Sequence, residues 1–449
     1  MEKGKKDKKK KGVFQSEITR RDFLKVTGGI SLLGVTGVPF IVPKKALAQN
    51  DVIKIGMTVA LTGPQTDTGL AISRGAQAGM DFINKKGGVL GKKLELIVLD
   101  DSGLPPNAVA NTRRLATRFG CAAIMGGFHS TVGLAMRAPI HEIKIPYISP
   151  YCGNTQIIEN GYKPNYMFRC SVKMSWMSEF LVDFAVNALG KKKVAVLNEN
   201  TGWGSGGEKD ILKVLDNVGI KPVGVEMFNW GDKDMTPQLM RLRSKGAEVL
   251  VGYYLDPEGA QLAKSMRKIE YRPEIVTGMG IVSQFAELTG NEVAEGFLCA
   301  QTYSWCGKLE RRGQEVYDYI RNKFKMAGDC REFKAGSGTA GAFDSIHLLA
   351  LGIEAAGTCK VPECWAKIRD ALEKKVKFYD GLMARYSPPF EESDNRHDAL
   401  LPENYQMCAW HNGFLMPMTQ TPHWKKVLPE YQKKYLENHP RERERLGLT

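Results

Sequence analysis

The chain has 449 residues, of which 43% are hydrophobic and 25% charged, and a formal net charge of +14. This length exceeds one ordinary hydrophobic core, and the composition is that of a soluble globular protein, so two domains are expected. The first 48 residues carry a net charge of +8, which leaves only +6 on the remainder. That charge gives no basis for nucleic-acid binding.

The N-terminus has the pattern of an export signal. A lysine-rich segment precedes a twin arginine, Arg20-Arg21, a short apolar run over residues 26–42 and Ala46-Leu47-Ala48. This order predicts a cleaved signal peptide at residues 1–48 that is exported by the Tat translocase. The alternative is a transmembrane anchor, but four glycines and one proline make the run weakly apolar. No other apolar run approaches the ~20 residues that span a bilayer.

Strands and helices are expected to alternate over residues 52–149. Apolar, β-branched runs predict strands at 52–60, 94–99, 121–125 and 145–149, and helical spacing predicts helices at 69–85, 107–119 and 132–143. This alternation predicts a doubly wound parallel sheet. Ser130 is expected to cap the third helix, at the sheet edge where α/β proteins bind small molecules.

The same alternation restarts after residue 172 and predicts a second α/β lobe. Strands are expected at residues 193–197, 222–227, 249–254, 275–277 and 297–302, and helices at 175–189, 207–218, 237–244 and 257–269. Further helices are expected at 308–326, 339–356 and 362–374, and antiparallel strands at 381–386 and 405–410. On the second of these helices, Asp344 and His347 are expected to form a surface or capping pair.

The nine cysteines are an odd number, so at least one thiol is expected to be free. Export allows disulfides, and short spacing makes Cys359–Cys364 the best local candidate, followed by Cys299–Cys306. The spacings typical of zinc sites are lacking. We therefore expect neither a metal nor another cofactor.

Several short motifs occur in a characteristic order along the chain. They are Ile53-Lys54-Ile55-Gly56, Leu61-Thr62-Gly63-Pro64, Arg74-Gly75, Gly87-Gly88-Val89-Leu90-Gly91, Asp100-Asp101, Ile145-Pro146-Tyr147-Ile148-Ser149-Pro150, Lys193-Val194-Ala195-Val196 and Ala294-Glu295-Gly296. Each motif is weak alone, but the ordered set resembles the type I periplasmic solute-binding proteins of ABC importers. Among these proteins, the set is similar to the subfamily that binds branched-chain amino acids and amides. The resemblance covers nearly all of residues 51–420.

The resemblance implies an α/β fold of two Rossmann-like, doubly wound parallel-sheet lobes joined by three crossover segments. Lobe boundaries are expected near residues 172, 300 and 400, giving lobe 1 from 51–172 and 300–400, and lobe 2 from 173–299 and 401–449. The implied protein is a monomer in the periplasm. It performs no chemistry, captures a small molecule between its lobes and delivers it to an inner-membrane ABC permease.

The resemblance also implies ligand contacts in lobe 1. The loop after the third strand of such proteins holds a serine that fixes the ligand's carboxylate or polar head, here Ser130, with Thr131 beside it. The loop after the Ile-Ser-Pro strand gives backbone contacts, here at Cys152 and Gly153. The first loop contributes a side chain just before its glycine, here Thr68.

In lobe 2 the resemblance implies two aromatic contacts, Trp203 and either Tyr253 or Tyr254. Amino-acid-binding members also hold the substrate ammonium with carboxylates, and the matching positions here are residues 174–176, including Trp176, and Met279, none of them acidic. An ammonium without a carboxylate would carry a large desolvation cost. We therefore expect a hydrophobic or aromatic carboxylate, or a small amide, rather than a zwitterionic amino acid.

Three alternatives remain at this point. One is branched-chain amino acid binding proper, and another is a periplasmic ligand sensor of the same fold. The third is a dinucleotide-dependent enzyme, because residues 202–207 fit G-x-G-x-x-G before a helix. Against the enzyme, Trp203 would place an indole where the backbone must approach a pyrophosphate, and Glu199 adds negative charge.

Overall fold

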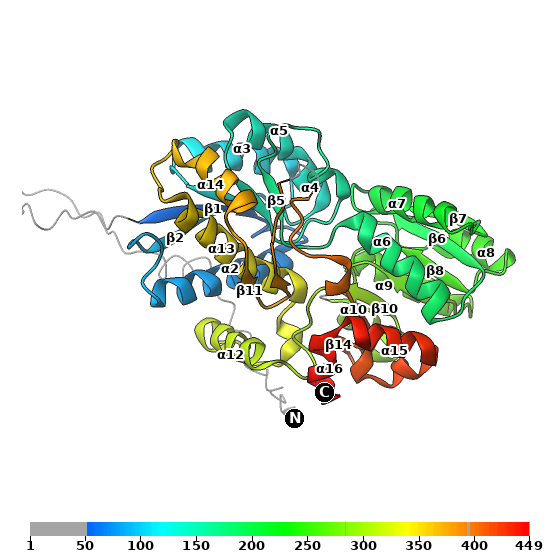
Figure 1. Ribbon diagram of the computed structural model, residues 1–449. Coiled ribbons are helices and arrows are strands. Elements are labelled where there is room, and N and C mark those ends of the chain that lie inside the picture. Colours follow the sequence, from blue (N-terminus) through cyan, green and yellow to red (C-terminus); the bar gives the residue numbers. More distant parts are fainter. Residues whose placement is uncertain (1–51, 283, 393–395, 449) are drawn as a thin grey trace, which may run out of the picture. The chain divides into compact units, whose positions relative to one another are not determined.

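The computed structural model describes residues 52–282, 284–392 and 396–448, and the predicted signal peptide lies outside them. Two sheets organise the described residues, each with helices packed against it (Figure 1). We call the part built on the five-stranded sheet lobe 1 and the part built on the seven-stranded sheet lobe 2. Within the described ranges, no helix is both long and apolar enough to cross a membrane.

The sheet of lobe 1 is parallel throughout, with strand order β2-β1-β3-β4-β5. Its strands are β1 (Ile53–Val59), β2 (Leu94–Asp100), β3 (Ala123–Gly126), β4 (Tyr147–Ser149) and β5 (Met167–Arg169). Its helices are α2 (Thr66–Lys85), α3 (Pro105–Thr117), α4 (Ser130–Ala135), α5 (Arg137–Ile143), α12 (Arg311–Phe324), α13 (Gly336–Ala356) and α14 (Cys364–Lys374).

Both faces of this sheet are buried. Ile124, Tyr147 and Met167 belong to one core cluster with residues of α3, α4 and α5. Their chain neighbours Ile148 and Phe168 belong to the cluster that includes residues of α2 and α13. Successive side chains of a strand point to opposite faces, so strands covered on both sides contain near-continuous apolar runs.

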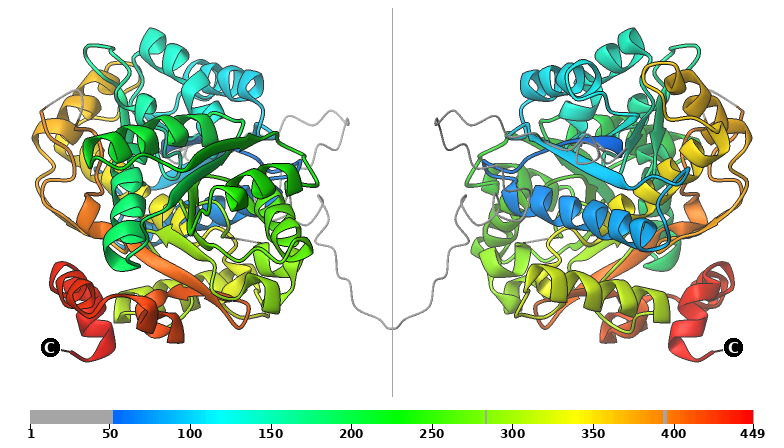
Figure 2. Two further views of the ribbon diagram at one scale, coloured as in Figure 1. Left: turned by 90° about the vertical axis from the view of Figure 1, so that its right-hand side faces the viewer. Right: turned by 90° about the vertical axis from the view of Figure 1, so that its left-hand side faces the viewer.

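The sheet of lobe 2 has the order β14-β13-β10-β9-β8-β6-β7, with β13 and β14 antiparallel to their neighbours. Its strands are β6 (Val194–Glu199), β7 (Gly224–Phe228), β8 (Val249–Gly252), β9 (Glu274–Thr277), β10 (Leu298–Gln301), β13 (Gln406–His411) and β14 (Phe414–Pro417). Its helices are α6 (Met174–Asp183), α7 (Gly204–Asn217), α8 (Thr236–Ser244), α9 (Asp256–Lys268), α10 (Phe285–Thr289), α11 (Asn291–Ala294), α15 (Pro429–Asn438) and α16 (Pro440–Leu446). Figure 2 shows the C-terminal helices, in red, close to β13, and the Tyr435 hydroxyl accepts a hydrogen bond from the Met407 N–H at 3.2 Å.

The chain passes between the two sheets three times, after β5, after β10 and after the short hairpin of β11 (Tyr379–Asp380) and β12 (Arg385–Tyr386). A buried ion pair joins the first passage to the third, because Arg169 Nε lies 2.5 Å from Asp398 Oδ1. Backbone hydrogen bonds reinforce it, from Arg169 N to His397 O and from Ala399 N to Arg169 O, both at 2.8 Å. The lobe boundaries near residues 172, 300 and 400 stay a prediction.

Three expectations about single elements were wrong. The helix expected over residues 132–143 is divided at Met136 into α4 and α5, since Pro139 has no N–H for the carbonyl four residues earlier. The strand expected at 381–386 is part of the β11–β12 hairpin. Asp344 is not a surface residue: it is fully buried and accepts hydrogen bonds from the N–H groups of Leu382 and Met383, which hold that hairpin.

The cysteine pairing also differs from the expectation. The disulfide joins Cys306 to Cys330, 24 residues apart, while Cys299, Cys359 and Cys364 are free thiols. Cys306 follows β10, and Cys330 begins a short 3-10 turn between α12 and α13. The spacing of the cysteines alone could not identify this pair. Helix α12 lies between the two residues in the chain and brings Cys330 back to Cys306.

We expect Asp398→Ala to lower the free energy of unfolding by about 3–5 kcal/mol, because it leaves the buried Arg169 guanidinium without its counter-charge. Urea unfolding followed by circular dichroism measures the loss. Glu142→Ala is the matched control, since it breaks the exposed Arg113–Glu142 pair and should cost less than about 1 kcal/mol. Equal losses in the two variants would contradict the structural role of Arg169.

Candidate functional site

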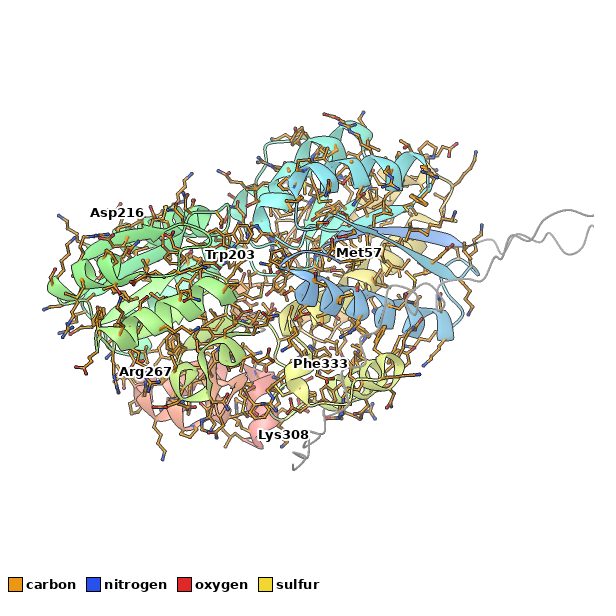
Figure 3. All side chains as sticks on the ribbon, turned by 180° about the vertical axis from the view of Figure 1, so that it is seen from behind. Met57, Trp203, Asp216, Arg267, Lys308 and Phe333 are labelled. Carbon is orange, nitrogen blue, oxygen red and sulfur yellow. A yellow bond between two sulfur atoms is a disulfide. The ribbon has the colours of Figure 1, made fainter. Side chains whose placement is uncertain are left out.

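Loops at the carboxyl ends of both sheets meet at one narrow cavity of about 20 Å³. Lobe 1 contributes the loop after β3, with Phe128, His129 and Ser130, and the loop after β4, with Tyr151, Cys152 and Gly153. Lobe 2 contributes one residue after each of β6, β8 and β9, and these are Trp203, Leu255 and Met279. Figure 3 shows Trp203 at the boundary between the two lobes.

Hydrogen bonds fix the two lobe 1 loops against each other. The Tyr147 hydroxyl donates to the carbonyl of Gly126 at 2.6 Å, which ties β4 to the end of β3. The Asn154 N–H donates to Ser130 Oγ at 3.3 Å, and the Cys152 thiol donates to the carbonyl of His129 at 3.2 Å. Ser130 is the first residue of α4 rather than its cap, which is His129.

Arg169 supports the second of these loops from behind. Its Nη1 donates to the carbonyls of Gly153 and Asn154, both at 2.8 Å. The backbone of the cavity wall is therefore held by the same guanidinium that pairs with Asp398. Charge-assisted bonds of this kind are about twice as strong as neutral ones.

Trp203 is the main side chain of the lobe 2 wall. It is only 5% exposed, and its ring lies edge-on to Tyr253 with centroids 4.8 Å apart. A Cβ on Gly153 would lie 2.5 Å from Trp203 Cζ3, so the indole packs directly on the lobe 1 backbone. The indole Nε1 is buried and has no hydrogen-bond partner among the described residues. An unmet buried donor beside a cavity suits a ligand with an acceptor group.

The two lobes touch each other around the cavity. The Asn154 side-chain amide donates to the carbonyl of Gly202 at 2.8 Å, and the Gly202 N–H donates to Thr131 Oγ1 at 3.3 Å. On the other side, the Tyr151 hydroxyl lies 3.5 Å from the carbonyl of Met279. The backbone of Gly202 in lobe 2 is therefore hydrogen-bonded to the side chains of Asn154 and Thr131 in lobe 1.

Among the described residues that line the cavity, none is a carboxylate. Burial lowers the pKa of His129 to about 4 and raises that of the Cys152 thiol to about 12, so both are uncharged at neutral pH. A lobe 2 carboxylate that approaches one lining residue is Glu199, whose Oε1 lies 4.0 Å from His129 Nε2. Its oxygens accept hydrogen bonds from the Leu255 N–H at 3.0 Å and the Thr201 hydroxyl at 2.6 Å.

Five of the nine predicted site residues line the cavity, namely Ser130, Cys152, Gly153, Trp203 and Met279. The other four lie elsewhere. Thr68 is buried in α2, Thr131 contacts Gly202, Trp176 packs beside Lys173 with Nζ 4.6 Å from its ring, and Tyr254 is buried near Phe228.

Sequence reasoning missed four lining residues, which are Phe128, His129, Tyr151 and Leu255. Three of them are chain neighbours of a predicted contact, and Phe128 lies two residues before Ser130. The sequence signal that could have identified them is their position just after a strand, because the loops at the carboxyl edge of a parallel sheet face the same region.

The glycines of residues 202–207 are explained by packing. A Cβ on Gly204 would lie 1.9 Å from the carbonyl oxygen of Glu199, and one on Gly207 would lie 2.0 Å from the Tyr253 ring. The pattern therefore reflects close contacts inside lobe 2, and a dinucleotide is not needed to account for it.

Comparison with known proteins agrees with this geometry. The family model described as "Periplasmic binding protein" matches residues 52–398. An "Amino acid binding protein" of Pseudomonas aeruginosa is 30% identical over 307 residues, covering 68% of this chain and 79% of the relative. A "Leu/Ile/Val-binding protein homolog 1" of Brucella suis is 26% identical over 362 residues, covering 80% and 91%.

Solved structures share the fold at lower identity. The substrate-binding protein LivJ of Streptococcus pneumoniae, in complex with isoleucine, has a TM-score of 0.69 at 23% identity, covering 81% of this chain and 97% of its own. A solute-binding protein of Rhodopseudomonas palustris, in complex with 4-hydroxybenzoate, has a TM-score of 0.67 at 17% identity, covering 82% and 95%. The chain belongs to the periplasmic binding protein family, and it is an extracytoplasmic solute-binding protein rather than an enzyme.

Proposed function

We propose that this protein captures a hydrophobic or aromatic carboxylate, or a small amide, between its lobes and delivers it to an ABC permease. The observation that carries the proposal is the cavity lining, which combines aromatic side chains with neutral hydrogen-bonding groups and contains no carboxylate. We further propose that the protein is a monomer exported through the Tat pathway, as its N-terminal sequence predicts.

The polar head of the ligand would bind to lobe 1. Ser130 Oγ and the backbone around Cys152 and Gly153 lie on one wall, held by Arg169. Neutral donors of this kind can meet a carboxylate or a carbonyl oxygen. The unpaired indole N–H of Trp203 offers a further donor from the facing lobe.

The apolar body of the ligand would lie among the aromatic rings. Phe128 and Tyr151 are stacked with centroids 5.7 Å apart, and Trp203 approaches from lobe 2. Stacked and edge-on aromatic contacts favour a flat ring over a compact aliphatic chain. The fold admits such a ligand, since the R. palustris structure is a complex with 4-hydroxybenzoate.

Capture requires movement of the lobes or side chains. A cavity of about 20 Å³ holds little more than one water molecule. A ligand with ten heavy atoms would therefore enter when the contacts of Asn154 and Thr131 with Gly202 are open. Closing over the ligand then adds contacts from the second lobe, which shifts the population toward the closed form.

Branched-chain amino acid binding is the second candidate, because curated relatives carry Leu/Ile/Val-binding names. Glu199 is the group that could meet an ammonium in that case. Its oxygens, however, are already hydrogen-bonded to Leu255 and Thr201, and it does not line the cavity. Leucine binding at micromolar affinity that disappears in Glu199→Gln would favour this candidate over the first.

We expect a thermal-shift screen of the purified protein to single out aromatic acids such as 4-hydroxybenzoate, with no response to leucine. A ligand at 100 times its dissociation constant adds about 2.7 kcal/mol of stability.

Trp203→Ala should weaken binding of the best ligand by about 10- to 100-fold, and Ser130→Ala by about tenfold, measured by isothermal titration. Trp424→Phe, in the C-terminal segment, should leave the affinity unchanged.

The screen can contradict the proposal in two ways. Leucine binding without any response to aromatic acids or amides would replace the proposed ligand class with amino acids. Unchanged affinity in Trp203→Ala would place the ligand outside the cavity described above.

Burial raises the pKa of Glu199 to about 7, above the ordinary 4.5 of a glutamate. The folded protein therefore binds the extra proton between pH 4.5 and 7, and Glu199 lowers stability as pH rises through that window. Glu199→Gln cannot ionise, so its unfolding free energy relative to wild type should rise by up to about 3 kcal/mol from pH 4.5 to 7 and then stay level. Urea unfolding at several pH values measures the difference, and the opposing titration of His129 is common to both proteins. Glu430→Gln, exposed on α15, should show no such rise.

A further inference from the structure

We propose that Glu295, His411 and His423 form a binding site for one divalent transition-metal ion, of which zinc is the best match, on lobe 2. None of the three lines the cavity, so the inference is independent of the proposed ligand. Their donor atoms all lie within 4.8 Å of one another. The chain spacings of these residues gave no hint of the site, because three separate segments supply them.

The geometry is close to that of a bound ion. His411 Nδ1 lies 2.8 Å and His423 Nε2 lies 2.6 Å from the same oxygen, Glu295 Oε1. Zinc binds nitrogen and oxygen at about 2.0–2.2 Å, which separates tetrahedral ligand atoms by about 3.3 Å. Small side-chain rotations would open this space. The two rings are nearly perpendicular, with an interplanar angle of 81°, so both nitrogens can point at one central atom.

Backbone structure holds two of the ligands in place. His411 ends β13 and pairs with Phe414 across the turn residues Asn412 and Gly413, which have φ values of 52° and 80°. Positive φ at both positions is the type I′ hairpin turn that Asn-Gly favours. Glu295 is fixed next to this strand, since the N–H of Gly296 donates to the carbonyl of Trp410 at 2.9 Å.

The third ligand comes from the C-terminal segment. His423 lies in a 3-10 turn, Pro422–Lys426, and its side chain is 14% exposed. A Cβ on Gly296 would lie 3.3 Å from His423 Cε1, so glycine leaves room for the imidazole beside Glu295. The neighbouring Lys426 ammonium is held 3.1 Å from a carboxylate oxygen of Glu274.

The residue Asn412 contacts two of the three ligands. The Asn412 N–H donates to Glu295 Oε2 at 2.9 Å, which leaves Oε1 for the ion. The Asn412 side-chain amide lies 3.1 Å from His411 Nε2. The nitrogen of that amide faces Nε2, and the Nδ1–H of His411 donates to Glu295 Oε1 at 2.8 Å, so binding of an ion would displace the Nδ1 proton.

The donor set decides the class of ion. Two imidazoles and one carboxylate suit zinc, and also nickel and copper, whereas magnesium and calcium prefer oxygen ligands alone. His411 and Glu295 side chains are 26% and 35% exposed, so water can complete the coordination. The bound ion would link β13, the loop before β10 and the C-terminal segment. Because a metal binds the folded chain, it would stabilise their packing.

The test is a zinc titration of the untagged, chelator-stripped protein at pH 7.5, in competition with a chromophoric chelator. We expect one zinc ion per chain, and no competition from magnesium or calcium. His411→Gln and His423→Gln should each weaken binding at least tenfold, and the double variant should bind none. Excess zinc should raise the thermal midpoint of the wild type and leave that of the double variant unchanged.

Two controls separate this site from other possible ligands. His347→Gln, on α13, and Cys359→Ser, a partly buried free thiol, should keep one zinc ion with unchanged affinity. Cobalt provides a readout on the wild type alone, since tetrahedral coordination gives strong visible absorption. The proposal is overturned if the wild type binds no zinc at millimolar concentration, if the double variant binds as well as the wild type, or if either control removes binding.

Discussion

The fold depends on one charged group placed where no water reaches it. Arg169 is fully buried, and its guanidinium meets Asp398 on one side and backbone carbonyls of the cavity loop on the other. Burying an ion pair costs several kcal/mol per ion unless hydrogen bonds satisfy it. Here the bonds run from β5 to two other segments, so the cost of burial is offset only when all three segments are in register. The pair therefore couples the edge of the lobe 1 sheet, a passage between lobes and one wall of the cavity.

The cavity between the lobes is lined by described residues that carry no charge at neutral pH. His129 and Cys152 are kept neutral by burial, and Arg169 acts through the backbone without lining the cavity. A neutral lining selects ligands by shape and by hydrogen bonding, and it penalises any charge that arrives without a partner. Glu199 lies beside the lining residue His129, and burial raises its pKa because the surroundings oppose its charge.

The alternation of strands and helices could be predicted from the sequence because buried parallel strands leave apolar runs of recognisable length. Short elements could not: β5 and β11 have three and two residues, too few for any periodicity. The Cys306–Cys330 bridge and the burial of Asp344 depend on which segments meet in space. Within the site, the ordered motifs located both lobe 1 loops and Trp203. The aromatic pair of Phe128 and Tyr151 was missed, because neither stands at a position where spacing alone distinguishes a lining residue from core.

The contact between Gly153 and Trp203 bears on how the lobes respond to a ligand. The indole lies so close to the glycine that one added methyl group would overlap it. Since the Gly153 backbone is held by Arg169, the overlap could be relieved only on the lobe 2 side. Because residue 153 has no side chain, the Trp203 ring lies directly against its backbone. A larger residue at this position would hold the two lobes further apart. In the closure proposed above, this contact is where the two lobes would meet, and a ligand would favour the closed form by the free energy of its contacts with both lobes.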